Sequence, residues 1–125
     1  MNILCISRFF KGVDFMRAGA AQNVNMFLLT SLQLKDEEWP YDILTDKFYM
    51  EEDEKGNWDL EVVINGLAHT MQHIKFDVLV ALDDFDVENT AYIREYFRIP
   101  GMGETTARYF RDKFSIPDGH VLIIY

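Results

Sequence analysis

Three short apolar runs, separated by helix-like segments, constrain the fold of this chain more than any other feature. They cover residues 3–6, 24–29 and 77–82, and each consists almost entirely of aliphatic, aromatic or sulfur-containing residues. Runs of this length are typical of strands buried on both faces of a parallel sheet. We therefore expect an α/β domain with a Rossmann-like, mostly parallel sheet flanked by helices and joined by right-handed crossovers.

One amphipathic helix stands out between the second and third apolar runs. Asn57 is expected to cap its start, which places Asp59 and Glu61 in the first turn, where the helix dipole favours negative charge. His69 and His73 fall on the opposite face, and we interpret them as solvent-exposed residues. The apolar residues repeat at helical spacing along one stripe, made of Leu60, Val63, Ile64, Leu67, Met71 and Ile74.

Shorter patterns predict the remaining elements. Small residues over 13–22 predict a helix that packs closely on the sheet, and Asp86 is expected to cap a helix over 87–97. The other expected elements are a short strand at 47–50, a helix at 104–113 and a final apolar strand at 120–125.

Composition narrows the class of protein. The 125 residues suit a single domain, and the one cysteine, Cys5, allows no internal disulfide, which favours a reducing, cytoplasmic location. Cys5 lies inside an apolar strand, so we interpret it as a small buried hydrophobe and not as a nucleophile. No apolar run approaches the length of a membrane span. The net charge of −9 argues against nucleic acid or an anionic membrane as a partner.

The charge is unevenly distributed along the chain. Residues 1–93 hold 7 basic and 17 acidic residues, whereas residues 94–113 hold 5 basic and 3 acidic ones. An anionic ligand is therefore expected near 94–113, where Arg108 and Arg111 share one face of the predicted helix and Lys113 follows. A solvated basic face is the alternative interpretation.

Polar residues follow the predicted strands where a parallel sheet places its ligands. Because ligands of such sheets bind beyond the carboxyl ends of the strands, we take five residues as candidates for a substrate cleft. The carboxylates among them could hold Mg²⁺, an amine or sugar hydroxyls. In the alternative interpretation, Asp86 only caps the next helix, and Asp83 and Asp84 are solvated. The five candidates are Ser7, Arg8, Asp83, Asp84 and Asp86.

The glycine pattern weighs against a dinucleotide site. Gly101 and Gly103 begin a fingerprint of the G-x-G-x-x-G type, but the third glycine is missing and no long buried strand precedes them. The loop after the first strand contains only Gly12. An NAD- or flavin-dependent enzyme is therefore disfavoured.

Three segments carry a resemblance to a known family. They are Ile3-Leu4-Cys5-Ile6-Ser7, Val80-Ala81-Leu82-Asp83-Asp84-Phe85-Asp86, and the run 98–113 with its Ile-Pro-Gly turn and its Asp112-Lys113 ending. With these segments the chain resembles the front end of an ATP-grasp ligase, in the biotin-carboxylase-like and carboxylate–amine ligase branch. The last run is the most specific of the three.

The resemblance implies that residues 1–113 form a Rossmann-like pre-ATP-grasp domain. Such enzymes use ATP and Mg²⁺ to convert a carboxylate to an acyl phosphate, which an amine or a similar nucleophile then attacks. The lysine of the Asp-Lys pair commonly contacts ATP phosphates in this family, and Lys113 occupies the matching position. Arg111, in the same basic segment, is the second candidate for binding ATP. The small-molecule substrate is expected at the sheet ends.

The sequence departs from the family after Lys113. The glycine-rich phosphate lid, the adenine strand and the acidic Mg²⁺ ligands of the ATP-grasp lobes have no counterpart in residues 114–125, which form a divergent tail. We therefore expect this chain to be inactive alone and to bind no cofactor tightly. The tail strand is expected to add to a sheet edge, either its own or that of a second copy in a homodimer. A standalone small-molecule-binding or dimerising regulatory module is the alternative function.

Overall fold

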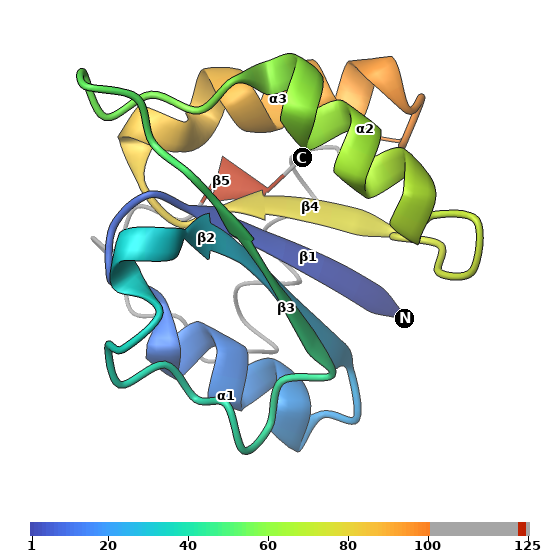
Figure 1. Cartoon of the computed structure of the whole chain (residues 1–125). Helices are drawn as coiled ribbons and strands as arrows, with labels where there is room; N and C mark the ends of the chain where they lie inside the picture. Colours follow the sequence, from blue (N-terminus) through green and yellow to red (C-terminus); the bar gives the residue numbers. More distant parts are fainter. Residues whose placement is uncertain (101–122, 125) are drawn as a thin grey trace.

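A five-stranded sheet lies at the centre of the molecule (Figure 1). The computed structural model describes residues 1–100 and 123–124. The strand order is β3-β2-β1-β4-β5; β1 pairs in parallel with β2 and β4, β2 pairs in parallel with β3, and β5 pairs with β4 in the antiparallel sense. This confirms the predicted mostly parallel sheet. The strands are β1 (Asn2–Ser7), β2 (Asn25–Ser31), β3 (Asp46–Met50), β4 (Val78–Ala81) and β5 (Ile123–Ile124).

The end of the chain adds to its own sheet. In β5, Ile123 is paired with Ala81 and Ile124 with Val80 of β4. The tail strand was expected to pair either with its own sheet or with that of a second copy, and the structure shows the pairing with its own sheet. The homodimer stays a prediction. The predicted helix at 104–113, and the rest of the tail, lie outside the described residues.

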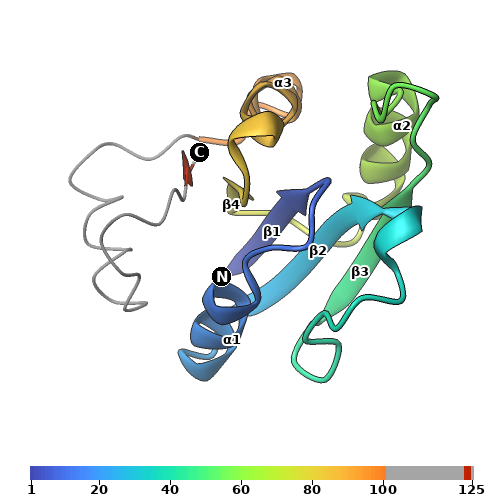
Figure 2. The same cartoon turned by 90° about the vertical axis from the view of Figure 1, so that its left-hand side faces the viewer.

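Helices cover both faces of the sheet (Figures 1 and 2). Helix α1 (Val13–Ala21) lies on one face, and α2 (Leu60–Thr70) and α3 (Val87–Tyr96) lie on the other. Since β1 is covered on both sides, alternate residues of it enter two separate cores. Ile3 and Cys5 pack with residues of α1 such as Phe15, whereas Leu4 and Ile6 pack with Val63 of α2 and Ile93 of α3. Within the described residues, no helix has the length and apolarity needed to cross a bilayer.

The start of α2 differs from the prediction. Asp59, and not Asn57, is the cap residue, and its side chain accepts a hydrogen bond from the Glu61 N–H. Asn57 lies in a turn before the helix and makes other contacts, described below. The helix ends at Thr70, so Met71 and Ile74 pack against the core from the segment that follows it. His69 and His73 are exposed, as predicted.

The strand order places a topological switch point between β1 and β4. The chain leaves the carboxyl end of β1 towards α1 on one face, and it leaves β4 towards α3 on the opposite face. In open α/β sheets, ligands bind in the crevice where neighbouring connections diverge in this way. The loops 8–12 and 83–86 flank that point.

Gly12 fits the narrow start of α1 because it has no side chain. Its φ is +84°, and a Cβ there would lie 2.7 Å from Leu82 Cδ1. An alanine here would clash with Leu82 and would also have to adopt the left-handed backbone conformation. We therefore expect Gly12→Ala to lower the free energy of unfolding by about 1–3 kcal/mol, measured by urea denaturation.

Gly66 provides the matched control for Gly12. It lies inside α2, and a Cβ added there would meet open space, with nothing within 4 Å. Gly66→Ala is expected to raise the free energy of unfolding by about 0.5–1 kcal/mol, because alanine loses less backbone entropy in a helix. Equal effects of the two substitutions would contradict this interpretation of Gly12.

Candidate functional site

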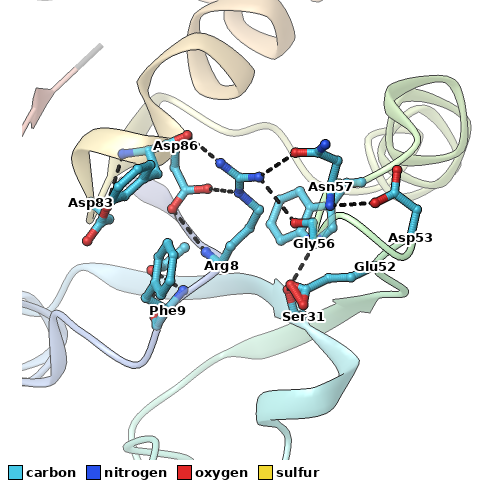
Figure 3. A network of polar contacts seen from close by, with 12 residues as sticks. Arg8, Phe9, Ser31, Glu52, Asp53, Gly56, Asn57, Asp83 and Asp86 are labelled. Carbon is cyan, nitrogen blue, oxygen red and sulfur yellow. Dashed lines mark hydrogen bonds and ion pairs between the residues drawn. The ribbon is translucent and has the colours of Figure 1, made fainter.

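Three loops converge at the carboxyl edge of the sheet (Figure 3). They are the loop after β1, the loop after β4, and a segment between β3 and α2 that reaches back over the strand ends. Polar side chains from all three form one connected network, which Figure 3 shows around Arg8. The network occupies the switch point identified from the strand order.

Arg8 is the centre of this network. Its Nε donates to Asp86 Oδ1 at 2.9 Å, and its Nη2 donates to the carbonyl of Phe85 at 2.6 Å. Its Nη1 donates to the Gly56 carbonyl at 3.2 Å and to Asn57 Oδ1 at 3.1 Å. The side chain of Arg8 is 14% exposed and that of Asp86 is 0% exposed. One guanidinium therefore joins the loop after β1 to both of the other loops.

Asp86 is held by the backbone as well as by the guanidinium. The Arg8 N–H donates to its Oδ2 at 3.0 Å. Burial raises the pKa of Asp86 above its ordinary value, and the hydrogen bonds from Arg8 offset only part of this effect. Asp86 stands at the N-cap position of α3 but makes no side-chain capping bond there, so the predicted cap is wrong. The ion pair uses the carboxylate instead.

Asp83 belongs to a second ion pair in the same place. Lys11 Nζ lies 2.6 Å from its Oδ2, and the Phe85 N–H donates to its Oδ1 at 3.0 Å. Burial by itself would raise the pKa of Asp83, but the hydrogen bonds from Lys11 and the Phe85 N–H outweigh it, and the pKa is lowered. Asp83 is therefore buried and paired, which overturns the interpretation of it as a solvated residue. Asp84 is exposed, as that interpretation expected.

Aromatic rings lie on the loop after β1 and on the loop after β4. Phe9 lies against Phe85 with ring centroids 5.4 Å apart, and both rings are exposed to solvent. Phe10 contacts the buried Trp39 edge-on. The exposed pair Phe9–Phe85 thus gives the switch point an apolar border beside its charged groups.

The third loop, residues 52–58, is referred to below as the strap. An isolated antiparallel bridge between Glu52 and Trp58 closes its base. Inside it, the Asp53 N–H donates to the Asn57 carbonyl, and Asp53 Oδ1 accepts from the N–H groups of Asn57 and Lys55. These hydrogen bonds lower the pKa of Asp53. The strap is therefore closed upon itself, largely through one carboxylate.

A chain of hydrogen bonds fixes the base of the strap to the sheet. The buried Trp58 donates from Nε1 to Ser31 Oγ at 2.9 Å, and Ser31 Oγ donates to Glu52 Oε2 at 3.0 Å. Ser31 is the last residue of β2. The strap thus has a buried anchor at its base, and its tip at Gly56 and Asn57 rests on Arg8.

An open hollow of about 620 Å³ lies beside the strap. Four of its lining residues carry carboxylates, so its surface potential is negative and unsuited to a phosphate chain. The lining consists of Tyr49, Met50, Glu51, Glu52, Asp53, Asn57, Asp59 and Val62.

The structure brings together most of the residues that the sequence singled out for a cleft. Arg8, Asp83 and Asp86 lie in one network. Ser7, the last residue of β1, precedes Arg8 and is fully buried, with its hydroxyl donating to the Phe9 carbonyl. Arg111 and Lys113 lie outside the described residues. Cys5 is fully buried, and burial raises its thiol pKa far above the ordinary value, which agrees with a structural role.

Sequence reasoning missed the strap and Lys11. In the sequence, the strap is marked only by the turn signal Gly56-Asn57. No local pattern indicates its contact with Arg8, which lies 48 residues before Gly56. In the part of the chain that the structure describes, no three His, Cys, Asp or Glu side chains are placed to bind one ion.

Comparison with known proteins gives a similarity in fold. No protein-family model matches the chain, and no curated protein sequence matches it. Among solved structures, the L-amino acid ligase from Bacillus licheniformis superposes with a TM-score of 0.64 at 16% sequence identity. The match covers 86% of this chain and 25% of the ligase, so this chain spans about a quarter of that protein's length. At this identity the similarity shows a shared fold.

Proposed function

We propose that this chain is the N-terminal, substrate-side domain of an ATP-grasp ligase. The complete enzyme would use ATP and Mg²⁺ to activate a carboxylate and join it to an amine or a similar nucleophile. The observation that carries the proposal is the structural similarity to an L-amino acid ligase over 86% of the chain. The family resemblance of the three segments quoted from the sequence supports it independently.

The chemistry of the switch point is compatible with such a role. A planar guanidinium binds a carboxylate through two parallel hydrogen bonds more specifically than an ammonium can. Arg8 presents this group at the edge of the sheet where ligands of α/β domains bind. We assign to it the recognition of the substrate's carboxylate, with the exposed rings of Phe9 and Phe85 as the border of the cleft.

We assign the main ATP site to lobes of the complete enzyme other than this domain. The hollow beside the strap is lined by carboxylates, and a triphosphate would be repelled there. We propose that Lys113, with Arg111, contacts the phosphates in the complete enzyme, and that Mg²⁺ is bound by ATP-grasp residues. Phosphoryl transfer depends mainly on positioning and on neutralising charge, so this domain would supply the orientation of the substrate.

Titration of ATP–Mg²⁺ into this chain tests the assignment of the nucleotide. The expected dissociation constant is about 1 mM or weaker, a binding free energy of about −4 kcal/mol, measured by isothermal titration calorimetry. ADP–Mg²⁺ serves as the matched ligand and should bind no differently. Micromolar affinity for ATP would show that the nucleotide site lies within these residues and would contradict the proposal.

Titration of L-amino acids, followed by amide chemical shifts, tests the assignment of the substrate. The free carboxylate should perturb the amides of residues 8–12 and 83–86, and the corresponding amino acid amide, which lacks the carboxylate, should not. Equal perturbation by the acid and the amide, or shifts confined to other parts of the sheet, would contradict a carboxylate site at the switch point.

A further inference from the structure

The two sides of the Arg8 guanidinium are held unequally. Towards the loop after β4, Nε and Nη2 donate over 2.9 and 2.6 Å to Asp86 and Phe85, and the Asp86 carboxylate is buried. Towards the strap, Nη1 donates over 3.2 and 3.1 Å to Gly56 and Asn57. Shorter hydrogen bonds to a buried carboxylate are the stronger ones. The contact between Arg8 and the strap is therefore the one that breaks first.

The hydrogen bonds inside the strap and at its base do not involve Arg8. The tip of the strap is joined internally through Asp53, and its base is anchored by Trp58 and Ser31. Releasing Gly56 and Asn57 from Arg8 breaks none of these hydrogen bonds. Arg8 would meanwhile remain in position, since Asp86 and Phe85 continue to hold it.

Arg8 has the donors that a carboxylate needs. A guanidinium carries five N–H groups, and the side chain of Arg8 makes four hydrogen bonds. The remaining N–H, on Nη2, has no acceptor among the residues that the structure describes. With the strap released, one oxygen of a carboxylate can accept from Nη1 and the other from Nη2.

We propose that the strap is a displaceable cover on Arg8: a carboxylate ligand replaces Gly56 O and Asn57 Oδ1 as the acceptor of the Nη1 hydrogen bonds, and the strap tip swings away from the guanidinium. The strap and the ligand compete for the same N–H groups. This inference rests on the proposed function for its ligand, a carboxylate, and for Arg8 as the group that binds it.

Competition has a signature that a purely structural role of Arg8 lacks. Sodium acetate, the simplest carboxylate probe, is titrated at constant ionic strength, and the amide shifts of residues 8, 56, 57 and 85 are followed. Asn57→Ala removes one acceptor of the strap, so it should bind acetate about fivefold more tightly than the unmodified chain, the factor that corresponds to one weak hydrogen bond. Arg8→Lys keeps the charge but loses the planar fork, and should bind acetate at least about fivefold more weakly.

Two controls isolate the effect. Asn65→Ala changes an exposed asparagine inside α2, away from the network, and should leave acetate binding unchanged. Sodium chloride at the same concentration should produce none of the shifts.

Unchanged or weaker acetate binding by Asn57→Ala would overturn the proposal, as would the absence of acetate binding by both the variant and the unmodified chain. Tighter binding by Asn57→Ala together with no response to L-amino acids would support the displaceable strap and count against the ligase assignment, so the two can fail separately.

Discussion

Replacing Arg8 with methionine is expected to lower the free energy of unfolding by about 3–5 kcal/mol at pH 7. The substitution retains much of the aliphatic volume but leaves the carboxylate of Asp86, which is 0% exposed, without its cation. The buried carboxylate would then have lost its hydration without an opposite charge to replace it, and would keep only the hydrogen bond from the backbone N–H of residue 8. Urea denaturation of the variant and the unmodified chain measures the difference.

The loss is expected to depend on pH in a definite direction. Burial already raises the pKa of Asp86 in the folded chain, and Arg8→Met takes away the guanidinium that lowers it, leaving only the hydrogen bond from the backbone N–H of residue 8. A carboxyl group whose folded pKa exceeds its unfolded value destabilises the fold above the folded pKa, and this cost disappears as the pH falls towards the unfolded pKa of about 3.9. The difference in the free energy of unfolding between the variant and the unmodified chain should therefore become smaller as the pH falls from 7 to 4. A difference that becomes larger on acidification would contradict the assignment to Asp86.

Two further variants separate the buried ion pair from other effects of charge. Arg17→Met breaks the exposed pair with Asp42 and should have no measurable effect on unfolding, because solvent screens that pair. The double variant Arg8→Met, Asp86→Leu removes both buried charges and should recover most of the stability lost in the single variant.

Replacing Phe76 with alanine is expected to cost about 3–5 kcal/mol of the free energy of unfolding. Phe76 is 2% exposed and packs edge-on against Phe27 of β2, with ring centroids 5.2 Å apart. It lies in the core between the sheet and α2, so its removal leaves a cavity that the surrounding strands cannot close. Thermal and urea denaturation should both show the loss.

Phe85→Ala deletes a ring of the same size from an exposed position and is the control for Phe76→Ala. Phe85 is 70% exposed, and its ring contacts only the exposed ring of Phe9 among the described aromatic pairs. Its removal should change the free energy of unfolding by less than about 0.5 kcal/mol. Similar losses for the two phenylalanines would show that burial does not explain the effect at Phe76.

The strands and helices could be predicted because their signals are local. The apolar run at 77–82 contains β4, and the stripe that includes Val63 and Leu67 faces the core from α2. The site was predictable only in outline. The carboxyl ends of β1 and β4 indicated Arg8, Asp83 and Asp86 as neighbours, since parallel strands end at the same edge of a sheet.

The contacts within the site depend on tertiary structure that local patterns do not contain. Asp86 follows the pattern of a helix cap, but the Arg8 guanidinium competes successfully for its carboxylate because a buried charge needs an opposite charge. Asn57 was interpreted as a helix cap because of its position before the helix. Its side-chain oxygen instead accepts a hydrogen bond from Arg8. In each case a long-range ion or amide contact overrides a local preference.

The central position of β1 has a consequence for how the chain folds. Its neighbour on one side, β2, follows within about 25 residues, but Ile3 pairs with Val78 on the other side, 75 positions later in the sequence. Contacts between such distant segments slow folding, because a long loop must close before they form. During synthesis, one edge of β1 therefore stays bare until β4 has left the ribosome, and chains interrupted before that point are expected to aggregate through it.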